Sequence, residues 1–191
     1  GILPNIAEED SEMTDLVNEV VVDETEESVE EIAVVSENLT EERTETAEVV
    51  NRSMSLDASP IDEEKRTVKI AISSEEPVQR SFGNEVLEHS AEAIDLSFLA
   101  SGRAPLLIDH DPEKIVGVIE SVELDSSARR LRATVRFGKG ALAREAFDDV
   151  LDGIRANISV GYSISKMQKD ARDGETYIAK SWRPMEASLV S

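Results

Sequence analysis

The sequence predicts a β-rich α+β fold, a small mixed β-barrel or sandwich with helices packed outside, preceded by an acidic N-terminal arm. Residues 65–191 contain roughly seven short segments with strand-like patterning but a single strong helical pattern. Strands and helices do not alternate as a βαβ fold requires, so a Rossmann-type sheet does not fit. Charge density and residue types change sharply near residue 64, which separates the arm from the folded part.

The N-terminal segment, residues 1–64, is strongly acidic. It holds 21 acidic residues against Arg43 and Arg52, whereas residues 65–191 hold 20 acidic and 18 basic residues. The segment lacks aromatic residues and buries too little apolar surface to offset an ordering cost of about 1–2 kcal/mol per residue. We therefore expect a disordered or conditionally helical arm. Alternatively, a stripe of Val29, Ile32 and Val35 forms a helix that folds on contact with a partner.

The Ser/Asp/Pro-rich stretch 51–60 resembles a hinge and places the domain boundary at residues 64 and 65. The segments beyond it alternate apolar and polar residues or form short apolar runs, as strands do. Residues 93–100 have the spacing of a short amphipathic helix or turn. The expected strands are 67–73, 78–82, 105–109, 115–124, 131–137, 157–166, 176–180 and 185–190.

The clearest helix covers residues 141–151. Its predicted buried stripe consists of Leu142, Ala146, Phe147, Val150 and Leu151. Gly153 follows the last helical residues at the position where glycine commonly ends a helix. Asp173 and Gly174 predict a hairpin turn between the strands on either side.

Several classes of chemistry are excluded by composition. The chain has no cysteine and only two histidines, so a zinc site or a cysteine nucleophile is not expected. Nucleotide-binding loops are absent, and a net charge of −21 would repel nucleic-acid phosphates. The sequence also has neither a run of about 18 apolar residues nor a signal peptide pattern, so no membrane association is expected. We expect no cofactor and no metal.

Serine chemistry with a histidine base is what these exclusions leave. His110 closes the apolar strand 105–109, and Ser159 lies within the strand 157–166, two residues before Gly161. A serine hydroxyl becomes a strong nucleophile only when a base accepts its proton, and histidine titrates near neutral pH. From the residues alone, the favoured interpretation is that His110 is a turn residue and Ser159 an ordinary strand serine. Gly161 marks a place where another part of the chain could approach closely.

Three motifs carry a resemblance to a known family. They are LLIDHD (106–111), NISVGY (157–162), which follows a helix and a glycine, and MEASLV (185–190). In this order and spacing, the region 66–191 resembles the tailed-phage prohead (capsid maturation) serine proteases, which are related to the herpesvirus assembly proteases. The resemblance implies a small closed β-barrel ringed by a few helices.

The resemblance also implies roles for single residues. His110 would be the general base, Ser159 the nucleophile, and Glu186 the carboxylate that orients His110. Glu186 could instead be a solvent-facing strand residue, with Asp109 or Asp111 as alternative partners of the histidine. His89 is expected in a surface loop.

The function implied is that of a serine endopeptidase that cleaves scaffold or capsid-precursor segments, and itself, during procapsid maturation. The alternative is a catalytically inactive scaffolding or capsid-assembly protein with a protease-like domain. The substrate would bind as an added strand. The expected location is the interior of the phage procapsid, in the host bacterial cytoplasm, and the resemblance also allows a homodimer.

Overall fold

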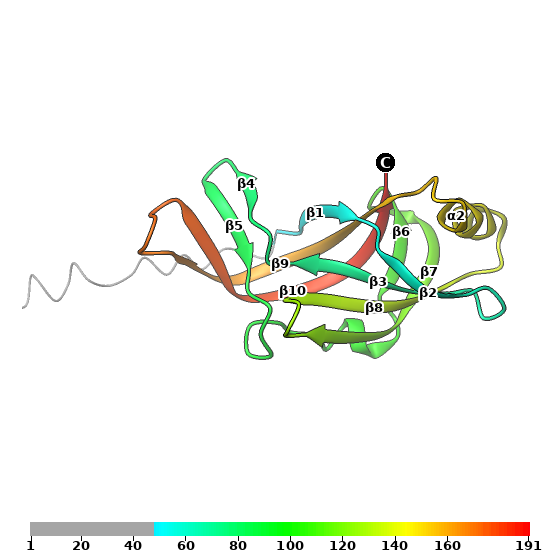
Figure 1. The fold of residues 1–191 in the computed structure, drawn as a ribbon, viewed down its shortest axis with the longest axis horizontal. Helices are drawn as coiled ribbons and strands as arrows, with labels where there is room; N and C mark the ends of the chain where they lie inside the picture. Colours follow the sequence, from blue (N-terminus) through cyan, green and yellow to red (C-terminus); the bar gives the residue numbers. More distant parts are fainter. Residues whose placement is uncertain (1–47) are drawn as a thin grey trace, which may run out of the picture. The chain divides into compact units, whose positions relative to one another are not determined.

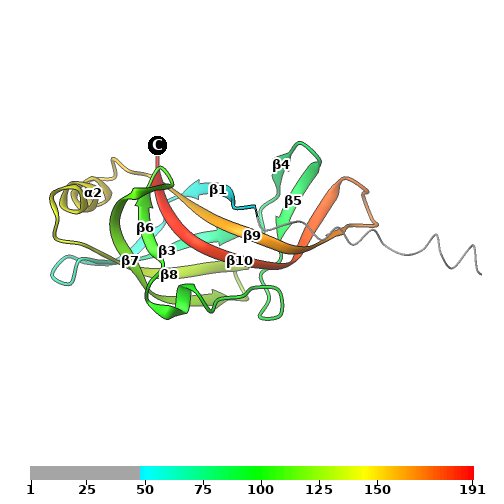
Figure 2. The ribbon, with the colours of Figure 1, turned by 180° about the vertical axis from the view of Figure 1, so that it is seen from behind.

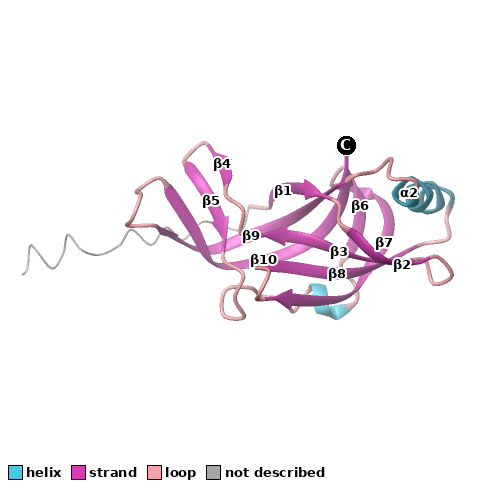
Figure 3. Ribbon diagram, viewed as in Figure 1, coloured by secondary structure: helices cyan, strands magenta, loops and turns pink. Residues whose placement is uncertain are grey.

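The computed structural model describes residues 48–191. Most of the predicted acidic arm lies outside the described residues, so its disorder and its helical stripe stay predictions. The described part is dominated by strands, with one α-helix and one short 3-10 helix (Figure 3). The strands are β1 (Val50–Ser55), β2 (Ala58–Asp62), β3 (Thr67–Ser74), β4 (Val78–Arg80), β5 (Gly83–Leu87), β6 (Pro105–Ile108), β7 (Asp111–Asp125), β8 (Arg130–Phe137), β9 (Asn157–Lys169) and β10 (Thr176–Val190).

The strands form one ten-stranded sheet with the order β1-β9-β10-β6-β7-β8-β3-β2 and with β5 joined to β10 and β4. The sheet curls around the apolar core as a half-barrel (Figures 1 and 2). Within residues 48–191 the edge strands β1 and β2 are not paired with each other. The β-rich class is therefore confirmed, whereas the closed barrel and the ring of several helices are not shown.

Strand β10 lies at the centre of this architecture. It pairs antiparallel with β9 and parallel with β6 and β5. Two separate strands, 176–180 and 185–190, were predicted here. Pro184 lies between them and lacks the amide hydrogen that a ladder needs. The structure instead keeps one strand, with register irregularities between Ala179 and Ser181, between Ser181 and Trp182, and between Pro184 and Glu186. The strand accommodates Pro184 through these irregularities. Trp182, on the same strand, packs into the core with 1% exposure.

Residues 50–62, which the sequence places in the arm, form β1 and β2. Strand β1 pairs antiparallel with β9, and β2 pairs antiparallel with β3. The serines, aspartates and proline of this stretch are typical of a hinge, but their backbone groups complete the two edges of the sheet. The structured region therefore begins before the predicted boundary at residue 64.

The helix α2 (Ala141–Leu151) begins and ends where the sequence predicts, and Gly153 beyond its end has a φ of +69°. The prediction of its buried face was partly wrong. Leu142 and Leu151 are 41% and 36% exposed. The small side chains of Ala143 and Ala146 let the helix lie close to the sheet instead. Phe147 packs against Phe137 with ring centroids 5.1 Å apart.

The segment 93–100 does not form the amphipathic helix that was one of its two predicted forms. It consists of turns that lead into the 3-10 helix η1 (Leu99–Ser101). Ile94 and Leu99 are buried, so the apolar spacing reflects separate core contacts rather than one helical face. Among the described residues, no helix is long and apolar enough to cross a membrane.

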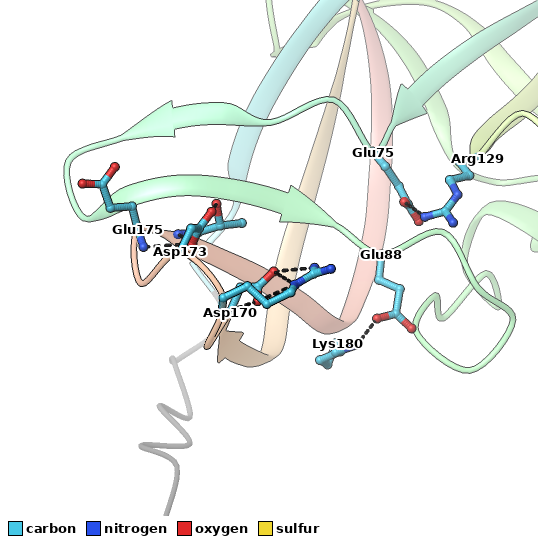
Figure 4. A network of polar contacts seen from close by, with 9 residues as sticks. Glu75, Glu88, Arg129, Asp170, Asp173, Glu175 and Lys180 are labelled. Atoms are coloured by element: carbon cyan, nitrogen blue, oxygen red, sulfur yellow. Dashed lines mark hydrogen bonds and ion pairs between the residues drawn. The ribbon is translucent and has the colours of Figure 1, made fainter.

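The far end of the β9–β10 hairpin carries a group of charged side chains (Figure 4). Asp173 caps the predicted turn, accepting backbone hydrogen bonds from Glu175 and Thr176 at 3.0 Å. Nearby, Glu88 pairs with Lys180 and Glu75 with Arg129. Such partly exposed pairs contribute little to stability, typically about 0–1 kcal/mol each.

His89 is buried, with 4% exposure, so the prediction of a surface loop was wrong. Its Nδ1 lies 2.8 Å from the carbonyl oxygen of Leu87 and its Nε2 lies 2.7 Å from Ser73 Oγ. The ring also packs on Trp182, with centroids 5.4 Å apart. Burial lowers the pKa of His89, so the neutral ring is the form that fits this site.

We expect His89 to make folding stability depend on pH. Below pH 6.5, the ordinary pKa of the ring, the unfolded chain takes up a proton that the buried ring does not. The free energy of unfolding should therefore fall as the pH is lowered from about 7 to about 5. Denaturant unfolding of the native protein and of a His89→Asn variant measures this, and the variant should show a smaller loss. An identical loss in both proteins would contradict the assignment.

Candidate active site

Three neighbouring strands bring the predicted site residues together. Sheet order places β10 between β9 and β6. Ser159 on β9 lies opposite Ser188 on β10, and Gly161 lies opposite Glu186. Because side chains two residues apart share a face of a strand, Ser159 and Glu186 project from the same face of the sheet.

His110 reaches this face from a tight turn between β6 and β7. Asp109 and His110 have φ values of 50° and 57°, which is the pattern of a two-residue type I′ hairpin turn. Left-handed backbone costs a non-glycine residue about 1 kcal/mol or more, although aspartate and histidine tolerate it better than most. Strand β10 holds the turn, because Asp109 N–H donates to the Leu189 carbonyl at 3.0 Å and His110 N–H donates to Ser188 Oγ at 2.8 Å.

The three side chains form a continuous chain of hydrogen bonds. His110 Nδ1 lies 2.6 Å from Glu186 Oε1, and His110 Nε2 lies 2.8 Å from Ser159 Oγ. A carboxylate can only accept, so the neutral ring carries its proton on Nδ1 and leaves Nε2 free to accept the serine proton. This is the arrangement of a nucleophile, a base and an orienting acid.

The alternative partners of the histidine are engaged elsewhere or directed away. The Asp111 carboxylate pairs with Lys114 Nζ at 3.1 Å and accepts the Glu113 N–H at 2.9 Å. Asp109 is exposed. The structure thus brings Ser159, His110 and Glu186 together and leaves both aspartates out of the chain.

The site is shielded from water. Ser159 is fully buried, and the side chains of His110 and Glu186 are 23% and 12% exposed. Burial raises the pKa of Glu186, while its hydrogen bond to His110 and the Gly161 N–H act in the opposite direction. Its second oxygen, Oε2, is buried without a hydrogen-bond partner among the described residues.

The sequence matches the model of the caudovirus prohead serine proteases over residues 64–191. The chain belongs to this family. A protein named major capsid protein, from Halomonas phage phiHAP-1, is 46% identical to this chain over 127 residues, which are 64% of the chain and 21% of that protein. The chain thus spans about a fifth of the length of this relative.

A solved structure resembles the prohead protease chain in fold. It is the bacteriophage T4 capsid assembly protease, gp21, which superposes with a TM-score of 0.51 at 11% sequence identity. The match covers 77% of this chain and 99% of gp21. At this identity the likeness concerns the fold alone.

Gly161 makes room for Glu186. A Cβ atom at residue 161 would lie 2.2 Å from Glu186 Oε1 and 3.1 Å from Asn51 Oδ1. The sequence predicts a close approach at this glycine, and the group that approaches most closely is the carboxylate bound to His110.

We therefore expect Gly161→Ala to reduce proteolysis by about 100-fold or more, since displacement of a positioning group by about 1 Å can have this effect. The measurement is the cleavage rate of a capsid precursor. Gly140→Ala is the matched control, because a Cβ at residue 140 has no atom within 4 Å. Equal loss in both variants, or none in Gly161→Ala, would contradict the role assigned to Gly161.

Three residues near the site were not identified from the sequence. Ser188 anchors the His110 backbone, and its position two residues after Glu186 is the one signal that could have indicated it. Arg52 belongs to β1, outside the matched family region, and its carbonyl oxygen accepts a hydrogen bond of 2.9 Å from Ser159 Oγ. Asn51 lies beside it and faces Gly161 across the pair of strands.

Proposed function

We propose that this prohead protease chain is a serine endopeptidase that cleaves scaffold or capsid-precursor segments, and itself, during procapsid maturation. The observation that carries the proposal is the hydrogen-bonded chain from Glu186 through His110 to Ser159. Membership of a protease family agrees with it. The likeness of the fold to a capsid assembly protease is consistent with the same role.

The geometry allows a two-step acyl transfer. Ser159 Oγ attacks the scissile carbonyl carbon while its proton moves to His110 Nε2. The proton then passes to the amine that leaves, and an acyl-enzyme remains on Ser159. Water repeats the sequence with His110 as base, and Glu186 stabilises the imidazolium in both steps. No resident cofactor has a part in these steps.

The proposed substrate is the capsid or scaffold precursor, inside the procapsid in the host cytoplasm. The nucleophile lies on a strand, which suits a peptide that binds in extended form beside it. Contact with nucleic acid or membrane is not part of the proposal, and the homodimer stays a prediction.

The test is to incubate the full chain with its capsid precursor and to identify the products by mass spectrometry. Cleavage should be blocked by a fluorophosphonate, and the adduct should map to Ser159. Cleavage that resists the reagent but stops with a chelator would instead indicate a metal-dependent hydrolase.

A second candidate is a catalytically inactive capsid-assembly or scaffolding domain. The observation that favours it is the name of the phiHAP-1 relative, a major capsid protein. Absence of any cleavage in the precursor assay, together with incorporation of the chain into assembled shells, would support this candidate over the protease.

A further inference from the structure

Strand β1 occupies the position at which an extended peptide would bind to this site. It is the edge strand of the sheet and pairs antiparallel with β9, the strand that carries Ser159 (Figure 1). Ser53 lies directly opposite Ser159, and Arg52 lies opposite Val160. Addition of a strand to an exposed edge is a common way for proteins to bind peptides. The chain's own segment thus lies where a substrate would lie.

The Arg52 carbonyl group lies next to the hydroxyl of Ser159, the proposed nucleophile. Ser159 Oγ lies 2.9 Å from its oxygen. Side chains stand roughly perpendicular to a sheet, so the Ser159 hydroxyl, which donates to this oxygen, reaches the Arg52 peptide group from one face of the sheet. The Ser159 hydroxyl has one proton for two acceptors, Arg52 O and His110 Nε2. When His110 takes the proton, the oxygen lone pair is free to attack.

The register supplies a donor for the same carbonyl. Leu56 N–H donates to the Ala156 carbonyl at 2.7 Å, and hydrogen-bonded pairs recur at every second residue of an antiparallel ladder. Arg52 and Val160 are therefore such a pair, and the Val160 N–H faces the Arg52 carbonyl oxygen. A backbone N–H in this place could stabilise the negative charge that develops on that oxygen.

The Arg52 side chain points to the other face of the sheet and is buried, with 7% exposure. Its Nη2 donates to the Glu76 carbonyl, whereas its Nη1 has no hydrogen-bond partner among the described residues. Burial lowers the pKa of Arg52, and the charges of Glu85 and Glu76 act against this effect.

Three polar side chains form a hydrogen-bonded group on this face of the sheet. Tyr162 donates to the Glu85 carboxylate, and Arg80 Nη2 lies 3.2 Å from Glu85 Oε1 and 2.8 Å from the Tyr162 hydroxyl. Arg52 lies opposite Val160, two residues before Tyr162, so its side chain shares a face of the sheet with Tyr162. The charges of Glu85 and Glu76 favour the guanidinium, and that of Arg80 opposes it. A cationic side chain at residue 52 is attracted by the carboxylates of Glu85 and Glu76. An acidic side chain at the same position would be repelled by them.

We propose that the Arg52–Ser53 peptide bond is the chain's own cleavage site, and that the pocket at Tyr162 and Glu85 selects arginine or lysine on the acyl side of the bond. This inference rests on the proposed protease function. Ser159 Oγ bonds to the Arg52 carbonyl carbon, the bond to the Ser53 nitrogen breaks, and that nitrogen receives the proton held by His110. Water then releases a fragment that ends in the Arg52 carboxylate.

The first experiment follows the full chain over time by intact mass and N-terminal sequencing. We expect a product that begins at Ser53 and its complement that ends at Arg52. Arg52→Lys should process within about threefold of the native rate, and Arg52→Glu should lose at least about tenfold. Processing at other bonds only, or equal rates for both variants, would overturn the inference.

A second experiment avoids the question of whether Arg52 variants fold. The full chain, incubated until its own processing has ended, is given peptides with the sequence of residues 49–57 in which residue 52 is arginine, lysine, alanine or glutamate. We expect kcat/KM for arginine to exceed that for glutamate by about 100-fold, and Glu85→Gln to reduce the arginine-to-alanine ratio about tenfold. Equal kcat/KM values for all four peptides would overturn the inference.

The two proposals fail differently in these experiments. If the capsid precursor is cut but Arg52–Ser53 is not, the protease stands and this inference is wrong. If no substrate of any kind is cut, the protease itself is wrong.

Discussion

Replacing Ser159 with alanine is expected to lower the rate of precursor cleavage by about 10⁴-fold or more. The hydroxyl is the only group within hydrogen-bond distance of His110 Nε2 that could act as a nucleophile in the described structure. Alanine removes it without adding volume, so the curled sheet should remain intact. The measurement is a time course of product formation by mass spectrometry, with circular dichroism as the check on folding.

Ser165→Ala is the matched control for this variant. Ser165 lies on the same strand, β9, but is exposed and forms its hydrogen bonds with Ser181, away from His110. Its replacement should leave cleavage within about twofold of the native rate. Native-like cleavage by Ser159→Ala would disprove the nucleophile assignment.

The next largest effect is expected for Glu186→Gln, a loss of about 10³–10⁴-fold in kcat. Glutamine keeps the size of the side chain, but its amide can donate a hydrogen bond to His110 Nδ1. The ring would then carry its proton on Nε2, where it cannot accept the proton of Ser159. The loss should appear in kcat rather than in KM, because the 2.6 Å contact joins Glu186 to His110 and not to substrate.

Asp111→Asn separates this role from a general effect of negative charge near the histidine. Asp111 is next to His110 in sequence, but its carboxylate pairs with Lys114. We expect activity within about threefold of native for this variant. A large loss in Asp111→Asn with near-native turnover in Glu186→Gln would move the orienting role to Asp111.

Local patterns predicted the elements whose partners are near in sequence. Helix 141–151 was predicted to the residue, because apolar spacing and Gly153 both act within a few residues. The hairpin of β7 and β8 follows from alternation around the turn at residues 125–127. Strand β10 was predicted as two strands, 176–180 and 185–190, because local patterns cannot anticipate irregularities that form only against β9.

The strands β1 and β2 could not be predicted from their own residues. Their serines, aspartates and Pro60 are typical of turns, and what makes them strands is the free edge of β9 and of β3. The burial of Arg52 and His89 has the same origin. Each is buried by elements distant in sequence, which no pattern of neighbours encodes.

The juxtaposition of the three site residues also depends on tertiary pairing. The residue types suggested serine chemistry, and the resemblance selected Ser159, His110 and Glu186, but their contacts follow from the order β9-β10-β6. Ser188 and Gly161 have significance only through the register that sets them opposite Ser159 and Glu186. A sequence read alone gives neither the order nor the register.

The central place of β10 has a consequence for when activity can arise during synthesis. It follows all the other described strands, yet it carries Glu186 and Ser188. It lies between β9, which carries Ser159, and β6, which leads into the turn with His110. Contacts between segments so distant in sequence form late in folding. A nascent chain whose last strand is still inside the ribosome therefore has no assembled nucleophile. Under the proposed function, cleavage could therefore begin only after residue 188 has been translated.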